Sequence, residues 1–358
     1  MSLVHDISES EFARTVRAAP HRPLPVIDVG KARMGDIAAV EEIAPAWRDV
    51  WENLGFLAIV NHGLESELIQ GMHEAAKQFH DLPIETKMSV RVTHDQKGYV
   101  PARGGLTTHS KFHNSKKLNT VECLVLATDF PEDHPGVISD KRFYGRTPWL
   151  PEEVVPGFRA TAENYMARIS ALGKSLLPVW AHALEMPADF FEPYFRESYT
   201  YFRVAKYPPK NDLEDGELGS NAHCDTGFNT FLPPANEEGI QILDTDETWF
   251  FPEIPDGAIM VNMGYFLERW TNWRFRATPH RVVPPVENDR YSFACFVNPG
   301  FDTPGDCIPT CVGQDNPPRE EPMSYWEYFD WYMKRSYTHY GKLQVSGESD
   351  VTVSEEDN

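Results

Sequence analysis

The first sixty residues combine apolar runs of strand length with one amphipathic stretch. Residues 24–28 and 56–60 are short apolar runs bounded by Gly, Asn or Asp, and this predicts two strands. Between them, the apolar residues at helical spacing are Trp47, Val50, Trp51 and Leu54. They predict a helix over 46–54 with one apolar face, and Pro45 either starts this helix or kinks it out of a preceding one.

The same helical periodicity recurs further along the chain. It predicts a helix at 65–81 and a longer one at 157–185, which is expected to be kinked at Pro178. The segment Ser324–Glu327 (SYWE) has the form of a capping box, which predicts the start of a last, aromatic-rich helix. Residues 1–22 show no such periodicity and are expected to form an irregular arm.

Short β-rich runs separated by Pro, Gly, Asn and Asp clusters dominate the stretch from 199 to 300. This spacing favours a sandwich or jelly roll over alternating strand–helix units. No linker divides the chain, so residues 1–341 are expected to form one mainly β domain. In it, a helix and strand region at 24–130 and C-terminal helices wrap the core. The acidic tail, 342–358, has few large apolar residues and is expected to be disordered.

Acidic residues outnumber basic ones, 54 against 33, which gives a formal net charge of −21. Such a balance repels phosphate backbones and anionic membrane surfaces, so we expect no nucleic-acid or membrane partner. The 41% hydrophobic and 12% aromatic residues are enough to bury a sizeable core. Because the whole chain is acidic, a site for a small anion needs individually placed Arg or Lys side chains.

Neither an export signal nor a membrane span is visible in the sequence. The first residues lack the basic and apolar regions of a signal peptide, and no run approaches about 18 apolar residues. The five cysteines are sparse and odd in number, so we expect a reducing, cytoplasmic location. Cys307 and Cys311 have a ligand-like spacing, but no second Cys or His pair that would complete a zinc site lies nearby.

The first candidate for chemistry is the segment 221–225 (NAHCD). Alternate side chains of a strand share a face, so His223 and Asp225 project together while Cys224 points away. Alone, such a pair is usually a surface or hydrogen-bonded pair. His280, however, opens another apolar run about 55 residues later. Two histidines and one carboxylate on one face match the facial triad that holds Fe(II) and leaves positions open for other ligands.

A second candidate lies in the apolar run RYSFACFVN that follows His280. Strand alternation puts Arg290 and Ser292 on one face. That face continues through Ala294, Phe296 and Asn298. A guanidinium among apolar residues is costly to bury unless it meets an anion, and its planar fork suits a carboxylate. The alternative is a structural salt bridge to a nearby Glu. Tyr207 either adds a hydroxyl donor to the same carboxylate or is an ordinary core tyrosine.

Taken together, these pieces resemble the isopenicillin N synthase-like family of iron(II)/2-oxoglutarate-dependent dioxygenases. The matching segments run in family order from about residue 24 to residue 300. They are LPVIDVG, GFLAIVNHGL, FHDLPIETK, YPP, HCDTGFNTFL, GIQIL, NMGYFLERWTNWRFRATPHRV and RYSFACFVNPG. The stretch from Asn262 to Val283 is the most specific of them. The resemblance implies a distorted jelly roll (double-stranded β-helix), with the iron- and 2-oxoglutarate-binding core at 199–300.

The resemblance also implies roles for individual residues. Iron would be held by His223, Asp225 and His280. The distal carboxylate of 2-oxoglutarate would be gripped by Arg290 and Ser292, with Tyr207. The implied reaction consumes O₂ and 2-oxoglutarate, releases succinate and CO₂, and hydroxylates, desaturates or cyclises a small-molecule substrate.

Candidate substrate residues follow from the same strand alternation, since Arg203 shares a face with Tyr207. The candidates are Arg203, Phe231, Phe296, Asn298 and Tyr99. For each of them, core packing or a surface salt bridge is the alternative. A second cation near the iron would favour a substrate that carries a carboxylate or phenolate. Residues 107–117 are either a lid over the cavity mouth or an ordinary loop.

Two other functions remain open at this point. One is an oxidase on the same scaffold that uses no 2-oxoglutarate, in which the Arg-x-Ser element holds a substrate carboxylate instead. The other is a binding protein with a degenerate site that holds zinc or no metal, against which the intact ligand set argues. The sequence leaves the substrate and the oligomeric state undetermined.

Overall fold

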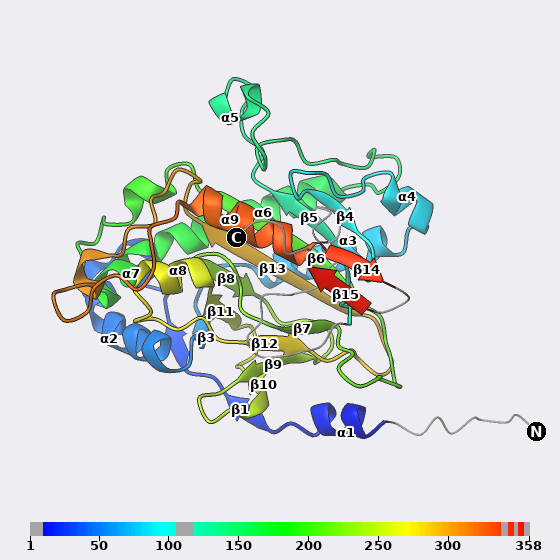
Figure 1. The fold of residues 1–358 in the computed structure, drawn as a ribbon, viewed down its shortest axis with the longest axis horizontal. Helices are drawn as coiled ribbons and strands as arrows, with labels where there is room; N and C mark the ends of the chain where they lie inside the picture. Colours follow the sequence, from blue (N-terminus) through cyan, green and yellow to red (C-terminus); the bar gives the residue numbers. More distant parts are fainter. Residues whose placement is uncertain (1–9, 105–116, 338–342, 347–349, 354–358) are drawn as a thin grey trace, which may run out of the picture.

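Two β-sheets face each other at the centre of the protein, and helices cover the larger one (Figure 1). The computed structural model describes residues 10–104, 117–337, 343–346 and 350–353. The larger sheet has the strand order β2-β3-β11-β8-β13-β6-β5-β4, and the smaller one has the order β1-β10-β9-β12-β7. Successive strands pass back and forth between the two sheets, as in the predicted jelly roll.

The strands are short apart from two nine-residue strands at the centre of the larger sheet, β6 and β13. The bounds in the larger sheet are β2 Val26–Asp28, β3 Phe56–Val60, β4 Gly98–Val100, β5 Glu122–Ala127, β6 Tyr199–Tyr207, β8 Asn229–Leu232, β11 Ile259–Met263 and β13 Arg290–Asn298. Those in the smaller sheet are β1 His21–Pro23, β7 Ser220–His223, β9 Ile240–Leu243, β10 Trp249–Glu253 and β12 His280–Val282.

The helices come mainly from the two ends of the chain and from the segment before β6. The α-helices are α1 Glu11–Arg17, α2 Ile37–Asn53, α3 Ser66–His80, α4 Ile84–Met88, α5 Pro135–Ile138, α6 Phe158–Ser175, α7 Leu177–Ala183, α8 Tyr265–Trp270 and α9 Tyr325–Ser336. The 3-10 helices are η1 Ala32–Met34, η2 Glu192–Phe195 and η3 Pro309–Cys311. None of the described helices has the length and apolar character needed to cross a bilayer.

Helices α3 and α6 pack against one face of the larger sheet, which we call its outer face. Tyr165 of α6 stacks on Phe202 of β6 with ring centroids 5.1 Å apart. His80 of α3 has its Nε2 3.1 Å from the carbonyl oxygen of Val204 in the same strand. The opposite, inner face looks toward the smaller sheet. Because side chains alternate along β6, Arg203 and Tyr207 belong to the inner face.

The predicted strands at 24–28 and 56–60 and the predicted helix at 65–81 are confirmed by β2, β3 and α3. The helix predicted at 46–54 is the C-terminal half of α2, so Pro45 lies inside a longer helix rather than at its start. The stretch 157–185 is not one kinked helix but two, because α6 ends before Leu176 and Pro178 sits in the first turn of α7.

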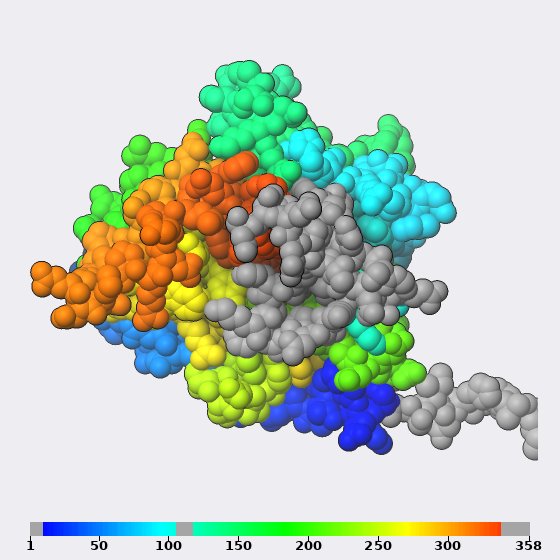
Figure 2. Space-filling view, in the orientation of Figure 1, coloured from blue at the N-terminus to red at the C-terminus, as the bar shows by residue number. Residues whose placement is uncertain are grey.

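The prediction of an irregular arm at 1–22 is wrong within residues 10–22. Ser10 caps α1 by accepting a hydrogen bond from the Ala13 amide at 3.1 Å. Val16 is buried with Leu213 and Leu218. Strand β1 then pairs in parallel with β10, so this segment lies along the smaller sheet (Figure 2). These contacts come from residues about 200 positions away, which no local periodicity reveals.

The tail expected to be disordered contains a two-stranded hairpin. Strand β14 (Leu343–Ser346) pairs antiparallel with β15 (Asp350–Val353). The local sequences LQVS and DVTV each alternate apolar and polar residues, which favours strands despite the acidic composition. The capping box at Ser324 and Glu327 is confirmed at the start of α9.

Candidate functional site

Three potential metal ligands converge between the two sheets. His280 of β12 is the direct antiparallel partner of His223 of β7, so strand pairing places the two imidazoles side by side. Asp225 follows β7 by two residues. Its Oδ1 lies 3.8 Å from Nε2 of His223 and 3.6 Å from Nε2 of His280. The donor atoms of these three residues all lie within 4.8 Å of one another. They come from two segments that the sequence separates by more than fifty residues.

Hydrogen bonds at the far side of each imidazole orient both histidines. Nδ1 of His223 lies 2.7 Å from the carbonyl oxygen of Asn221, and Nδ1 of His280 lies 3.2 Å from that of Thr278. A carbonyl oxygen can only accept, so each Nδ1 carries the proton. Each Nε2 therefore has a free lone pair that faces Asp225. This is the arrangement in which an outer acceptor fixes the tautomer of a ligating histidine.

Asp225 is held in the same way by its second oxygen. Its Oδ2 accepts hydrogen bonds from the Thr230 hydroxyl of β8 and from the Asn262 side-chain amide of β11, both at 2.6 Å. With Oδ2 occupied by these two donors, Oδ1 is the oxygen left to face the histidines. The sequence analysis did not identify Thr230 and Asn262. Their alternation on β8 and β11 could have indicated them, because each lies on the inner face.

The electrostatics at His223 and Asp225 favour a cation over protons. Burial lowers the pKa of His223 to about 3, and the neighbouring His280 adds to this effect. Burial acts in the opposite direction on Asp225, but His280, His223 and the Thr230 hydroxyl hold the pKa of that carboxyl well below its usual range. The pKa of His280 is raised by Asp225 against the effect of burial. A neutral imidazole and an ionised carboxylate are the protonation states that a metal ion requires.

A cavity between the two sheets, here called the sheet cavity, extends from the cluster to Arg290. Its lining includes all three candidate ligands with Arg203, Tyr207, Arg290 and Ser292. Arg290 is 2% exposed, and its Cζ lies 5.1 Å from the Tyr207 ring centroid. The structure thus brings together the residues that the sequence assigned to a carboxylate.

Arg290 is buried without a carboxylate partner among the described residues. Its Nε donates to the carbonyl oxygen of Glu237 at 3.0 Å, whereas its Nη1 is buried and has no hydrogen-bond partner. The salt bridge to a nearby Glu, which the sequence left open as an alternative, is therefore not formed within the part of the chain that the structure describes. A buried guanidinium with an unsatisfied N–H fits a ligand carboxylate in the sheet cavity.

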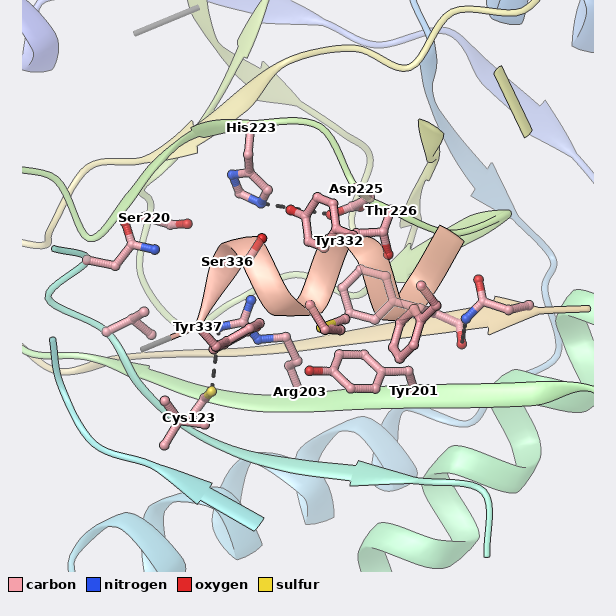
Figure 3. A pocket seen from close by; sticks show the side chains of 17 residues that line it. Cys123, Tyr201, Arg203, Ser220, His223, Asp225, Thr226, Tyr332, Ser336 and Tyr337 are labelled. Carbon is pink, nitrogen blue, oxygen red and sulfur yellow. Dashed lines mark hydrogen bonds and ion pairs between the residues drawn. The ribbon is translucent and has the colours of Figure 1, made fainter. Parts of the chain in front are cut away.

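A second cavity, here called the helix cavity, lies on the other side of the cluster (Figure 3). His223 and Asp225 line one side of it, Cys123, Tyr201 and Arg203 line the opposite side, and α9 runs across it. The α9 side of the lining consists of Phe329, Tyr332, Met333, Ser336 and the adjacent Tyr337. Arg203, His223, Asp225 and Phe296 border both cavities. His223, Asp225 and Arg203 therefore face both cavities.

Of the five predicted substrate residues, the structure places three at these cavities. Arg203 and Phe296 border both, and Asn298 lines the helix cavity. The Asn298 amide is already committed, because its Oδ1 accepts from the Phe228 amide at 2.9 Å and its Nδ2 donates to the Phe296 carbonyl oxygen at 3.3 Å. Its role at the cavity is therefore mainly that of a wall.

The structure does not bring the other two, Phe231 and Tyr99, to either cavity, because both side chains point to the outer face. Phe231 is fully buried against α6, close to the position that a Cβ on Gly173 would occupy. The neighbouring Leu232 lines the sheet cavity instead. The Tyr99 hydroxyl donates to Glu122, and its neighbour Val100 lines the helix cavity. In both strands the assignment was off by one residue, which moves a side chain to the opposite face.

Sequence reasoning missed the contribution of α9 altogether. The helix was recognised as aromatic-rich, but nothing in its own periodicity says which sheet face it crosses. The predicted lid at 107–117 lies outside the described residues, apart from Lys117. That residue is seen as an ion-pair partner of Glu214.

Comparison with known proteins gives two family matches. The model described as "non-haem dioxygenase in morphine synthesis N-terminal" matches residues 24–152, and the "2OG-Fe(II) oxygenase superfamily" model matches residues 195–299. The second match contains every candidate metal ligand and both Arg290 and Arg203.

Relatives from plants and fungi match nearly the whole chain. Azadirone synthase from Melia azedarach is 29% identical over 316 residues, which cover 86% of this chain and 90% of that protein. The 2-oxoglutarate-Fe(II) type oxidoreductase hxnY of Emericella nidulans is 29% identical over 327 residues, which cover 89% of this chain and 91% of that protein. Flavonol synthase/flavanone 3-hydroxylase of Arabidopsis thaliana is 27% identical, with 91% and 93% covered.

Solved structures agree with this picture. A 2OG-Fe(II) oxygenase family protein from Caulobacter crescentus superposes with a TM-score of 0.73 at 26% identity, covering 87% of this chain and 98% of its own. A full-length protein from Neurospora crassa, solved in complex with alpha-KG and thymine, gives a TM-score of 0.74 at 24% identity, covering 86% and 95%. The second comparison supports the fold.

Proposed function

This chain belongs to the isopenicillin N synthase-like family of iron(II)/2-oxoglutarate-dependent oxygenases, and we propose that it holds its iron with His223, Asp225 and His280. It is an oxidoreductase that acts on a small-molecule substrate with Fe(II), 2-oxoglutarate and O₂. The convergence of two free Nε2 atoms and one free Oδ1 supports this ligand assignment. Three protein ligands would leave further positions on the ion open to other ligands.

We further propose that Arg290 binds the distal carboxylate of 2-oxoglutarate in the sheet cavity, assisted by Ser292 and Tyr207. The observation that carries this assignment is the buried Nη1 of Arg290, which lacks a partner in the described protein. An unsatisfied N–H in that position destabilises the ligand-free protein. This cost is removed when a carboxylate accepts a hydrogen bond from it. The Tyr207 ring against the guanidinium limits the directions in which Arg290 can point.

Bound iron and 2-oxoglutarate would supply the oxidising chemistry, with succinate and CO₂ as co-products. The residues of the chain then have three tasks. Thr230 and Asn262 keep Oδ1 of Asp225 directed at the metal site. The backbone carbonyls of Asn221 and Thr278 keep both histidines in the ligating tautomer. The apolar walls of the sheet cavity, such as Leu232 and Val282, exclude water from the cosubstrate.

We propose that residues 1–341 act as one catalytic domain with the core at 199–300. Support comes from the helix cavity, whose lining combines Val100, Asn298 and Tyr337 and so draws on most of the chain. We also propose a cytoplasmic location and no nucleic-acid partner. All five cysteines are free thiols, and the net charge of −21 disfavours contact with phosphate backbones.

The decisive experiment measures 2-oxoglutarate binding calorimetrically in the iron-loaded protein without oxygen. Arg290→Gln should weaken binding by about 30-fold or more, the usual loss when one partner of a buried charge pair is removed. Lys206→Gln is the matched control, because it removes one positive charge from the outer face of the adjacent strand, where Lys206 pairs with Asp289. His280→Ala should retain no stoichiometric iron, as measured by metal analysis.

Equal 2-oxoglutarate affinity in Arg290→Gln and wild type would contradict the cosubstrate assignment. Succinate release measured under oxygen tests the alternative function, that of an oxidase that uses no 2-oxoglutarate. If no succinate forms with any substrate while oxygen is consumed, Arg290 holds a substrate carboxylate instead. Full iron content in His280→Ala would contradict the ligand assignment itself.

A further inference from the structure

Arg203 carries a positive charge for which the described protein supplies no carboxylate. Its guanidinium lies on the inner face of β6, across the helix cavity from His223 and Asp225 (Figure 3). Its Nη2 donates to the Cys123 sulfur at 3.5 Å, and its Nε is buried with no hydrogen-bond partner. It makes no ion pair within the described ranges. The residue as a whole is half-buried, and the charge carries a desolvation cost that no described partner offsets.

Two of the tyrosines around Arg203 are neutral rather than anionic. Burial raises the pKa of the Tyr201 hydroxyl well above its usual range. The pKa of Tyr207 is likewise raised by burial, although Arg290 and Arg203 act against this effect. Neither phenol ionises at neutral pH, so neither can neutralise the guanidinium. Within the described ranges no anionic group is left to balance Arg203, so a molecule in the cavity is the candidate source of the counter-charge.

The charges expected in the loaded site leave Arg203 unbalanced. If the proposed function holds, Fe(II) and Arg290 bring three positive charges, and Asp225 and 2-oxoglutarate bring three negative ones. These charges sum to zero, so the positive charge of Arg203 is left without a counter-charge. Since the space around it excludes much of the solvent, one further negative charge is the best match.

The helix cavity has a mixed lining in which aromatic side chains are prominent. Phe296 of β13 and Phe329 and Tyr332 of α9 border it, together with Val100 and Val121. Polar side chains complete the lining, and they include Asn119, Ser220, Thr226 and Ser336. Ring faces beside a few polar groups suit a flat, ring-containing body. Arg203 stands on the side of the cavity that faces His223 and Asp225 across it.

From these observations we infer that the substrate is a monoanion with a ring-containing body. Its anionic group, a carboxylate or phenolate, is bound by Arg203, and its body lies in the helix cavity against α9. This inference deepens the proposed function and rests on it, because the helix cavity is the substrate site only if the metal cluster is the reaction centre.

The test on the wild-type protein compares acids with their neutral counterparts. Iron- and 2-oxoglutarate-loaded protein, kept free of oxygen, is titrated calorimetrically with trans-cinnamate, 3-phenylpropanoate and 2-naphthoate, and with the amide of each acid. The expected result is binding of at least one acid that is about 30-fold or more tighter than that of its amide. Equal affinity within every pair, or no binding of any acid, would overturn the inference.

Variants then assign the effect to Arg203. Arg203→Gln should abolish the preference for acid over amide, and Arg203→Lys should restore part of it because the charge returns without the planar fork. Lys206→Gln, on the same strand but the opposite face, should keep the full preference. A preference that survives in Arg203→Gln would show that another cation binds the anion.

The same samples separate this inference from the proposed function. Affinity for 2-oxoglutarate is measured in each variant, together with the thermal unfolding midpoint as a check on folding. If 2-oxoglutarate binds normally and depends on Arg290 while no acid preference appears, only the substrate inference fails. If Arg203→Gln loses 2-oxoglutarate instead of the acid, Arg203 belongs to the cosubstrate site and the inference is wrong.

Discussion

Charged side chains on the two faces of the larger sheet differ in whether the protein itself supplies their partners. On the outer face, Glu122 of β5 is the direct cross-strand partner of Lys206, and its Oε2 lies 2.8 Å from Nζ of Lys87. On the inner face, Arg203 of β6 and Arg290 of the neighbouring β13 each have a buried N–H with no partner. The same sheet therefore satisfies its charges on one side and leaves them unsatisfied on the other.

This difference distinguishes charged residues that stabilise the fold from charged residues that bind a ligand. An outer-face ion pair is complete in the folded chain, so removing one partner leaves the other buried and unpaired and costs stability. An inner-face guanidinium is completed only by a ligand, so its removal should cost binding and spare the fold. Four substitutions test this contrast, in order of decreasing expected effect.

Phe231→Ala removes the large outer-face side chain of β8. We expect the free energy of unfolding to fall by about 4 kcal/mol, because a fully buried ring is lost against α6 and leaves a cavity. Iron and 2-oxoglutarate affinities should not change, as measured in samples kept well below the denaturation midpoint. A change in either affinity without a loss of stability would return Phe231 to the candidate ligand-binding residues.

Glu122→Gln tests an outer-face ion pair through its pH dependence. Burial opposes ionisation, but His80, Lys87 and Tyr99 together lower the pKa of Glu122 to about 2 from an ordinary 4.5. A carboxyl with a depressed pKa stabilises the fold above its ordinary pKa, and that stability is lost as pH falls through the folded pKa. Urea denaturation should therefore show a loss of about 3 kcal/mol at pH 7.

The difference between wild type and Glu122→Gln should shrink steadily as pH falls from 4.5 toward 2. The control is Glu238→Gln, because Glu238 is an exposed partner of His21 and should contribute little at any pH. A deficit in Glu122→Gln that persists undiminished at the lowest pH would mean that packing, not charge, explains the loss.

Thr230→Val probes the inner face close to the metal site with little change in volume. It removes one of the two donors on Oδ2 of Asp225, so iron affinity should fall by about 10- to 100-fold. Competition with a chelator measures this. Thr200→Val is the control, since Thr200 donates to Ser170 on the outer face of β6. Equal losses in both variants would show that iron affinity reports general stability.

Arg290→Met has the smallest expected effect on the ligand-free protein. Removing an unmatched buried charge should leave stability unchanged or raise it by up to about 1 kcal/mol, whereas Lys87→Met should lower it. Added 2-oxoglutarate should raise the thermal midpoint of the iron-loaded wild type but not that of Arg290→Met. If Arg290→Met destabilises the ligand-free protein as much as Lys87→Met does, the contrast between the two faces disappears.

Local patterns in the sequence predicted much of the fold and the residues at the centre of the site. Strand alternation correctly placed Arg290, Ser292 and Phe296 on one face, because β13 is long and regular. It failed for Phe231 and Tyr99, which lie in strands of four and three residues. In such short strands, the alternation of side chains does not reveal whether the odd-numbered or the even-numbered residues face inward. The packing of α3 and α6, which involves distant residues, decides that.

Contacts over long sequence distances account for what remained hidden. Helix α1 is stabilised by Leu213 and Leu218, and strand β1 by pairing with β10, none of which is local in sequence. The place of α9 across the helix cavity likewise depends on tertiary packing. The orphaned N–H of Arg203 could be recognised only once its surroundings were known, although the sequence had already marked the residue as a cation near the iron.

The position of α9 has a consequence for how proteins of this kind diverge. The proposed metal and cosubstrate residues lie on strands of the two sheets or, in the case of Asp225, two residues beyond the end of one. The cavity-lining residues Phe329, Tyr332 and Met333 lie on α9, the last of the described helices, outside those sheets. Mutations in that helix can reshape the wall without disturbing strand register. Selection can therefore explore new substrates while the oxidation chemistry is inherited intact.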